Sequence, residues 1–343
     1  YYPYQSTYTQ GSYSGINTII ATYPGNPDLK WEKTFVANVG VDFELFNRRL
    51  YGDVNVYDKR TKDLFVRKNL SLTSGFTALN INGGELSNKG VEVTLNYDIV
   101  RNNKVTWTVF GNFGYNKNNV EDLGGETSFE QGTELIKIGK PLGTHYEVRY
   151  GGVDAATGRP LYYTADGVLT TVYNASNRVQ EFGTWEAPWK GGFGTSVKFG
   201  GFELSTLFSF QEGATKVDNL EFFLENPSFL AQGYNQSASL RQWQKPGDVA
   251  STGSPLYPFN FSSNLIHDAS FVRLRDVTLS FAFPRSLISK SKLVTNAKFY
   301  VQGTNLFMWT HWRGRDPEAG ATNINISEYP NPRAVTAGLN ITF

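Results

Sequence analysis

Apolar and polar residues alternate with a period of two along much of this chain. Between residues 91 and 99, the apolar residues Val91, Val93, Leu95, Tyr97 and Ile99 alternate with Glu92, Thr94, Asn96 and Asp98. Successive side chains of a β-strand point to opposite faces, so each such run predicts a strand with one apolar and one polar face. Runs of this kind predict nine strands, near 34–45, 49–62, 88–100, 104–117, 190–199, 201–212, 270–283, 297–309 and 333–343.

The links between the predicted strands alternate between short and long. The short links are FNRR (46–49), RNN (101–103) and GG (200–201). The long links are 63–87, 118–190, 213–269 and 309–332, and one of intermediate length lies at 284–296. Antiparallel neighbours that are joined in this way carry all their long loops at one end of the sheet.

Two architectures bury one face of such strands. A soluble sandwich or barrel turns the apolar face inward, whereas a transmembrane barrel turns it outward to lipid and lines its lumen with the polar face. The predicted strands exceed the usual length of about five or six residues, and polar residues such as Glu92, Asp98, Asn112 and Glu203 lie within them. These features favour an all-β fold, a transmembrane antiparallel β-barrel. We therefore expect the apolar residues of 91–99 to face lipid and the polar ones to face the lumen.

The composition narrows the classes of protein that fit. Only 18% of the residues are charged and the net charge is +1, so no nucleic-acid partner is expected. The absence of cysteine excludes disulfides, zinc–thiolate sites and a cysteine nucleophile. No run reaches the roughly 18 apolar residues of a membrane helix. The first residues show no signal peptide, so we expect that the chain either lacks its natural beginning or was never exported.

The final alternating run ends at the last residue of the sequence. Its apolar positions are Val335, Ala337, Leu339, Ile341 and Phe343. Outer-membrane barrels are recognised by their assembly machinery through a last strand that alternates in this way and ends in an aromatic residue. An aromatic side chain is also favourable at the rim of a membrane. We interpret these five residues as a barrel assembly signal, and an edge strand of a soluble sheet is the simpler alternative.

Signals for catalysis and metal binding are weak. The three histidines, His145, His267 and His311, lie far apart, and no HExxH, GxSxG, Walker or GxGxxG pattern occurs. The adjacent carboxylates Glu121 and Asp122 are expected to be solvated. We therefore expect no catalytic residue, no cofactor and no metal site, and the chain is not expected to be an enzyme.

The aromatic residues fall into two groups. Those near strand ends are expected to form girdles at the membrane interfaces: Trp107, Tyr115, Phe281, Phe283, Trp309 and Phe343. Those in the long loops, together with one arginine, are candidates for contact with a ligand or a partner protein, and packing within the loops is the competing explanation. They are Trp185, Trp189, Phe222, Phe223, Trp243, Trp312 and Arg313, with the Tyr162–Tyr163 pair beside them. Arg315 and Asp316 are further polar candidates, for which a solvated loop is the simpler interpretation.

The link at 213–269 contains an apolar cluster that is too dense for a freely solvated loop. The cluster consists of Phe222, Phe223, Leu224, Phe229 and Leu230. Apolar surface of this density normally becomes an interface or a local core. We expect an ordered loop with a short helix near 218–225 or 236–244 that contacts a partner protein or packs over the mouth of the barrel.

Several stretches resemble SusC/RagA-like TonB-dependent transporters, in the order in which that family carries them. They are GNPDLKWEKT (25–34), GGELSNKGVEVTLNY (83–97), GVDAATGRPLYY (152–163), WQKPGD (243–248), ASFVRLRDVTLSFAFP (269–284), GTNLFMWTHWRGRDPE (303–318) and YPNPRAVTAGLNITF (329–343). No single stretch is specific, but together they cover nearly the whole chain.

The resemblance implies a barrel of twenty-two strands, of which this chain would supply the last nine, over residues 1–343. A plug domain and a TonB box would lie outside the chain. The resemblance also implies an outer-membrane importer of oligosaccharides or peptides, with a SusD-like lipoprotein on its extracellular side and energy from TonB. A siderophore receptor without a lipoprotein lid and a soluble β-domain that binds carbohydrate remain alternatives. The substrate itself is not readable from these motifs.

Overall fold

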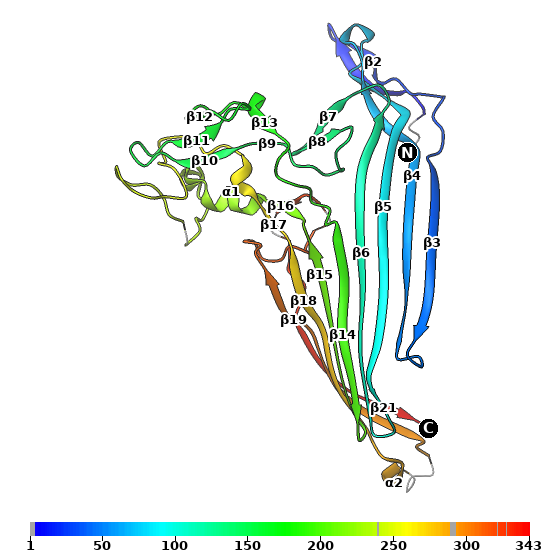
Figure 1. Cartoon of the computed structure of the whole chain (residues 1–343). Helices are drawn as coiled ribbons and strands as arrows, with labels where there is room; N and C mark the ends of the chain where they lie inside the picture. The colour runs from blue at the N-terminus through cyan, green and yellow to red at the C-terminus, as the bar shows by residue number, and fades with distance from the viewer. Residues whose placement is uncertain (1–3, 239, 289–292, 321, 327) are drawn as a thin grey trace. The chain divides into compact units, whose positions relative to one another are not determined.

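The computed structural model describes residues 4–238, 240–288, 293–320, 322–326 and 328–343. Its main feature is a sheet of nine strands in the order β21-β19-β18-β15-β14-β6-β5-β4-β3 (Figure 1). The strands are β3 (Lys33–Leu45), β4 (Leu50–Asn69), β5 (Ala78–Arg101), β6 (Val105–Leu123), β14 (Trp189–Phe199), β15 (Phe202–Glu212), β18 (Phe271–Ala282), β19 (Asn296–Thr310) and β21 (Ala334–Thr342). Each long strand lies beside the next long strand of the sequence, and the nine predicted strands are confirmed. The sheet is open, since β3 and β21 each have only one neighbour within it.

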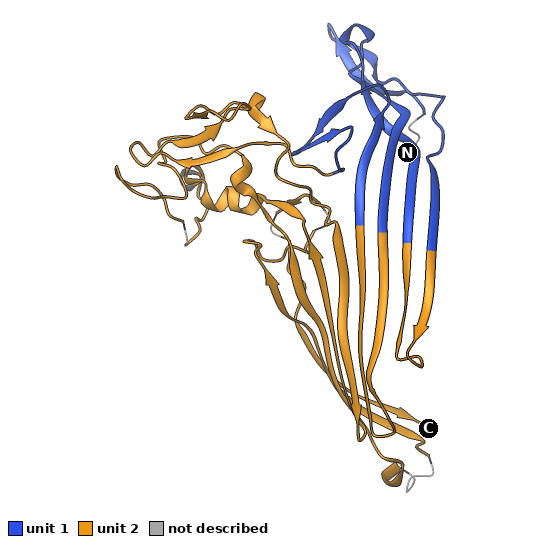
Figure 2. Cartoon of the chain, in the orientation of Figure 1, with its two compact units in different colours: residues 1–39, 56–90, 116–142 blue, residues 40–55, 91–115, 143–343 orange. Residues whose placement is uncertain are grey.

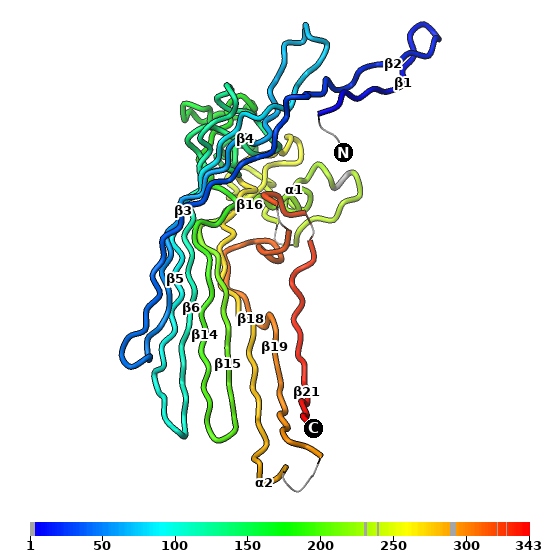
Figure 3. The backbone as a smooth tube through the Cα atoms, turned by 90° about the vertical axis from the view of Figure 1, so that its right-hand side faces the viewer, coloured from blue at the N-terminus to red at the C-terminus, as the bar shows by residue number. Residues whose placement is uncertain are grey.

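Short turns connect the strands at one end, as the sequence predicts. Gly200 and Gly201, between β14 and β15, have φ values of 54° and 88°. Two consecutive positive φ angles are typical of the two-residue hairpin turn that glycine adopts without strain. In Figure 3 this turn and the short helix α2 (Arg285–Ile288) lie at one end of the strands, and β16 (Thr215–Asp218) and α1 (Asn219–Glu225) lie at the other.

The prediction of a long loop at 63–87 is wrong. Strand β4 continues to Asn69 and β5 begins at Ala78, so the connection is residues 70–77 with one 3-10 turn, η1 (Leu72–Ser74). Asp63 has a φ of 60°, a left-handed conformation that β-bulges use, and bulges shift the alternation. The strand pattern is therefore lost from the sequence at this point, although the strand itself continues.

The sequence analysis also missed a hairpin before the first predicted strand. Strands β1 (Thr7–Tyr13) and β2 (Ile16–Tyr23) pair antiparallel around Ser14 and Gly15, which both have positive φ. These residues lie before the nine alternating runs, so the sequence predicts no strand there.

One face of the wall from β6 to β21 is apolar, in rows that cross the strands. One row, two residues inside the row nearest the turns, is Trp107, Val197, Leu204, Leu279, Val301 and Ala337. The row nearer the turns is Val105, Phe199, Phe202, Phe281, Phe299 and Leu339, and the row nearer the loops is Phe113, Gly191, Phe210, Val272 and Trp309. Phe202, Leu204 and Leu279 remain 52%, 41% and 49% exposed, so no second sheet of the described residues covers this face as a sandwich would require.

The spacing of these rows fits a membrane. Along β15, the two aromatic rows are separated by the segment from Phe202 to Phe210, which spans about 26 Å along the strand at about 3.3 Å per residue, or about 20 Å along the membrane normal for a strand tilted by about 40°. The apolar band of a transmembrane barrel is about 25 Å tall and is flanked by aromatic girdles. The aromatic rows therefore lie where the two membrane interfaces are expected.

The opposite face of the wall is polar and internally hydrogen-bonded. Glu203 lies 3.3 Å from Lys198 Nζ and 3.0 Å from Lys298 Nζ. Asp98 is buried and accepts a hydrogen bond of 2.8 Å from Thr108. On the same strand Val91, Leu95 and Tyr97 are exposed, whereas Val93 and Ile99 are half-buried and Glu92 is exposed, so the exposure follows the predicted alternation in part.

The chain forms two compact units, coloured separately in Figure 2. Unit 1 comprises residues 1–39, 56–90 and 116–142, and unit 2 comprises residues 40–55, 91–115 and 143–343. Unit 1 contains the β1–β2 hairpin, the hairpin of β7 (Ser128–Gln131) and β8 (Glu134–Lys137), and a small apolar core of Val120, Leu123 and Ile136. The further elements of unit 2 are β9 (Glu147–Val148), β10 (Tyr150–Val153), β11 (Pro160–Tyr163), β12 (Leu169–Thr170), η2 (Ala175–Asn177), β13 (Arg178–Val179), η3 (Pro227–Gln232), η4 (Ser263–Leu265), β17 (Ile266–Asp268) and β20 (Ile324–Asn325).

Candidate functional site

Two long connections of unit 2 fold together beyond the ends of the strands. They are residues 213–270, between β15 and β18, and residues 311–333, between β19 and β21. Strand β16 of the first connection pairs antiparallel with β17 and parallel with β20 of the second. The two connections therefore form one folded element, which we call the loop subdomain.

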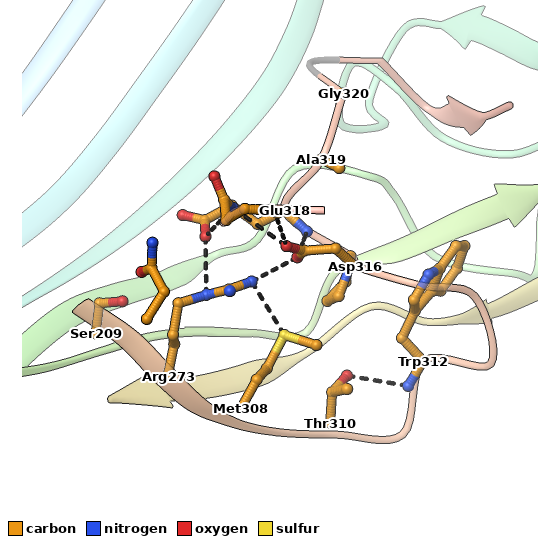
Figure 4. A network of polar contacts seen from close by, with 12 residues as sticks. Ser209, Arg273, Met308, Thr310, Trp312, Asp316, Glu318, Ala319 and Gly320 are labelled. Carbon is orange, nitrogen blue, oxygen red and sulfur yellow. Dashed lines mark hydrogen bonds and ion pairs between the residues drawn. The ribbon is translucent and has the colours of Figure 1, made fainter. Parts of the chain in front are cut away.

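A buried ion pair attaches the loop subdomain to the wall (Figure 4). Arg273 of β18 is 3% exposed and binds Asp316, which is 2% exposed. Arg273 Nε also lies 3.1 Å from Glu318 Oε2, and Asp316 accepts a hydrogen bond of 2.9 Å from the backbone of Asn331. Because a buried charge is costly unless it is paired, these contacts fix the 311–333 connection against β18.

A β-bulge brings a second arginine to the same place. The register of β18 shifts between Leu274 and Asp276, which leaves Arg275 as the extra residue. Arg275 donates 2.7 Å to Ser209 Oγ and forms an ion pair with Glu318. Bulges re-aim side chains in this way, and the alternation of the sequence gives no sign of it.

Further polar contacts tie the two connections to each other. Lys216 Nζ donates to the carbonyl oxygens of Pro317 at 2.8 Å and Gly320 at 3.2 Å. Burial lowers the pKa of Lys216, and nearby carboxylates offset part of this effect. The Asn325 amide donates to the carbonyl of Ala319 at 3.2 Å.

Helix α1 confirms the first of the two predicted helical segments, and no helix occurs at 236–244 among the residues described there. Asp218 caps α1 by accepting a hydrogen bond of 3.1 Å from the Glu221 backbone. Glu221 pairs with His267 and with Arg313, at 2.6 Å for the latter, and Arg313 also lies 3.2 Å from Glu225. Burial raises the pKa of both Asp218 and Glu225, and the charge of Glu221 raises them further.

The aromatic side chains of the 213–270 connection form one cluster. The Phe222 ring lies 5.6 to 5.8 Å from the rings of Phe223, Phe229, Phe259 and Phe261, measured between centroids. Phe222 also packs against the buried core of the loop subdomain, which is Val217, Phe259 and Leu265. The side chain of Leu230 lies outside the described part of the chain.

Phe223 belongs to the outer layer of this cluster. It stacks on Phe229 at 5.2 Å and on Tyr234 at 5.9 Å, and Tyr234 is 48% exposed. The cluster is thus a local core at Phe222 and a partly exposed aromatic surface at Phe223 and Tyr234.

The four tryptophans named from the sequence lie in different places. Trp312 is buried with Ala187, Ala214 and Ala269. It therefore packs between the loop subdomain and the end of the connection that precedes β14. Trp185 is half-buried beside Gly143, where an added Cβ would meet its indole nitrogen at 2.4 Å.

The other two tryptophans lie outside this cluster. Trp243 donates a hydrogen bond of 2.9 Å from its indole to the carbonyl of Ala155. Trp189 is not a loop residue, because it begins β14 and contacts the ring of Tyr115 at 4.5 Å. The structure therefore gathers Phe222, Phe223, Trp312 and Arg313 around α1. Trp243 belongs to the loop subdomain but bonds to Ala155, and Trp185 and Trp189 lie outside the subdomain.

A pocket of about 290 Å³ lies in the β11 part of unit 2. It is lined by Arg159, Pro160, Tyr162, Thr171, Tyr173, Tyr257, Pro258 and Asn260. The Arg159 guanidinium lies 4.8 Å from the centre of the Tyr257 ring, and the Asn260 amide donates 3.3 Å to the Tyr162 hydroxyl. Burial raises the pKa of Tyr162 and Tyr173, so both hydroxyls are neutral at physiological pH.

A metal-binding group and a membrane-spanning helix are both absent from the described residues. No group of three or more His, Asp or Glu residues that suits a metal ion occurs there. No helix in that part of the chain is long and apolar enough to cross a membrane.

Comparisons with known proteins agree with this geometry. A family model described as TonB dependent receptor-like, beta-barrel matches residues 2–306. TonB-dependent receptor P39 of Formosa agariphila is 26% identical over 397 residues, which cover 96% of this chain and 37% of P39. TonB-dependent receptor SusC of Bacteroides thetaiotaomicron is 24% identical and is covered over 32% of its length.

A solved structure of the RagAB peptide transporter superimposes with a TM-score of 0.90 and 29% identity, over 100% of this chain and 39% of that one. The chain spans 32 to 39% of the length of these relatives. Together with the two-faced wall and its aromatic rows, the matches show that the chain belongs to the TonB-dependent receptor β-barrel family and forms part of a transmembrane barrel in the outer membrane of a Gram-negative bacterium.

Proposed function

We propose that this chain is part of an importer that carries oligosaccharides or peptides across the outer membrane, using energy supplied through TonB. The observation that carries the proposal is the wall with one apolar and one polar face, to which Arg273 and Asp316 attach folded loops. The names of two relatives, SusC and the RagAB peptide transporter, support nutrient import. TonB would act through parts of the importer outside this chain.

A SusD-like lipoprotein is the partner that we propose for the loop subdomain. The aromatic surface formed by the exposed Tyr234 and the half-buried Phe223 stacked on it supports this choice, because aromatic residues are enriched in protein interfaces. Phe222 and the ion pairs around α1 would hold that surface in a fixed conformation.

The pocket beside β11 is our candidate for contact with one unit of the substrate. Its volume of about 290 Å³ suits one sugar ring or one amino-acid side chain. Aromatic faces with a few fixed polar groups are typical of small-molecule sites, and the stacked Arg159–Tyr257 pair and Asn260 supply them here.

Uptake by the complete importer tests the main proposal. A strain that lacks the gene would be supplied with fluorescently labelled oligosaccharide and peptide mixtures, before and after complementation, and in the presence and absence of TonB. We expect at least one class of label to enter only when both the gene and TonB are present. If the strain without the gene lost uptake of iron chelates and of no oligosaccharide or peptide, the proposal would be overturned in favour of a siderophore receptor.

The lipoprotein contact needs a separate test. Phe223→Ser combined with Tyr234→Ser should reduce co-purification of the lipoprotein with the importer. Val249→Ser combined with Leu256→Ser is the matched control, because both residues are exposed apolar residues of the same connection. Undiminished co-purification of the Phe223/Tyr234 variant, from a barrel that resists protease as the parent does, would sink the proposed contact.

A further inference from the structure

The two ends of the sheet carry opposite charge. The four connections at the turn end contain six Lys or Arg residues and no Asp or Glu; they are 46–49, 102–104, 200–201 and 283–295. The four connections at the loop end contain eleven Lys or Arg residues and sixteen Asp or Glu residues; they are 70–77, 124–188, 213–270 and 311–333. A net charge of +1 for the whole chain conceals this difference.

Three described cations of the turn end have no acidic partner. Arg49, Lys104 and Arg285 are exposed, lie in three different connections, and form no ion pair with any residue that the structure describes. Arg48 differs, because Glu44 lies 2.7 Å from its Nε. The strand residues Lys198 and Lys298 differ as well, since both bind Glu203 on the polar face.

An apolar residue of the turn end accompanies each unpaired cation. Phe46 is exposed and lies three residues before Arg49, Val105 follows Lys104, and Phe283 lies two residues before Arg285. Val105 belongs to the apolar row that includes Phe199, Phe202 and Phe281. Aromatic residues mark the membrane interface, and long cationic side chains next to them reach the headgroup layer.

We propose that Arg49, Lys104 and Arg285 form a collar that binds the phosphate groups of anionic phospholipids in the leaflet at the turn end. Charge complementarity carries the choice of partner, because connections that carry cations and no acidic residue, next to an apolar row, attract anionic headgroups. The acidic excess at the loop end makes the collar specific to one leaflet. This role is independent of what the importer transports.

Lipid retention by the complete importer tests the collar. Arg49→Gln, Lys104→Gln and Arg285→Gln would be combined, and retained phosphatidylglycerol and phosphatidylcholine would be counted by native mass spectrometry at low and high salt. The matched control combines Arg241→Gln, Lys245→Gln and Arg315→Gln, which are exposed cations of the loop end. Heat modifiability shows whether the triple variant has folded into a barrel. If it has not, the three single variants are measured instead.

We expect each collar substitution to weaken phosphatidylglycerol retention about fivefold and the triple about a hundredfold at low salt, since each cation near an anionic surface contributes separately. The effect should shrink at high salt, and phosphatidylcholine should not respond. Equal loss in the loop-end control would overturn the proposal. Preferential retention of lipopolysaccharide by the collar, in place of phospholipid, would overturn it as well.

Discussion

The wall and the loop subdomain bury opposite kinds of side chain. In the wall, Leu204 and Leu279 are exposed while Asp98 on the other face is buried. In the loop subdomain, apolar side chains such as Val217 and Leu265 are buried as in a soluble protein, and the charged pair Arg273 and Asp316 is buried with them. The apolar side chains of this chain are therefore exposed in the wall and buried in the loop subdomain.

The difference follows from the surrounding solvent. Lipid satisfies the apolar face of the wall, so no protein core is needed there and the backbone pairs only within the sheet. The loop subdomain lies in water, and its two connections are too short for a large core. Buried ion pairs and an aromatic cluster supply the contacts that its small apolar core lacks. Substitutions should therefore act differently in the two regions.

The largest effect should come from breaking the buried ion pair between Arg273 and Asp316, which attaches the loop subdomain to the wall. Arg273→Met leaves the charge of Asp316 buried without its cationic partner and should destabilise the loop subdomain by about 3–5 kcal/mol. Limited proteolysis of the 311–333 connection in the inserted importer measures this, and heat modifiability reports on the wall. Arg275→Met, which removes a less buried arginine, is the control and should have a smaller effect. Equal protease sensitivity of the two variants would contradict the comparison.

In the wall, the loss of stability caused by an introduced charge should depend on the face that carries it. Leu204→Arg places a charge on the apolar face, two residues inside the Phe202 row, and should cost about 1–3 kcal/mol, because the cost of a charge falls from the bilayer midplane towards the interface. Ser205→Arg, one residue further on the polar face, should change stability little. Urea unfolding of the complete barrel in lipid vesicles compares the two. A larger loss for Ser205→Arg would show that the assignment of the faces is reversed.

The last residue should affect assembly more than stability. Phe343 is 81% exposed, so its deletion removes few contacts from the folded barrel. The assembly machinery reads the terminal strand before any packing exists, so we expect lower surface levels of the deletion variant and a nearly unchanged urea midpoint. Normal surface levels would count against the assignment of an assembly signal to this strand.

The smallest effect should come from Glu225 in the loop subdomain. Its folded-state pKa lies above the ordinary value, so its contribution to stability decreases as the pH rises from about 4.5 through that raised pKa. Glu225→Gln should remove this pH dependence and change stability at pH 7 by less than about 1 kcal/mol. Protease resistance of the loop subdomain between pH 4 and 7 measures it. A variant that keeps the parent's slope would place the titration on another group.

The sequence alone determined the nine strands and their two faces, and it gave the position of helix α1 as one of two alternatives. These features depend on local alternation and on short-range turn and capping signals, which survive in any tertiary context. It also marked Phe222, Phe223, Trp312 and Arg313 as residues of an ordered loop region. It misplaced Trp189, which belongs to the wall, because its alternation extends only one residue beyond the predicted strand.

Only the tertiary structure decided which charges are buried. Asp316 resembled a solvated loop residue in the sequence, yet it pairs with Arg273, which lies 43 residues away. The bulge at Arg275 and the pairing of β16 with β20 bring these segments together, and neither leaves a periodic signal. Long-range pairing depends on the register of the whole sheet, and a local pattern carries no information about register between distant strands.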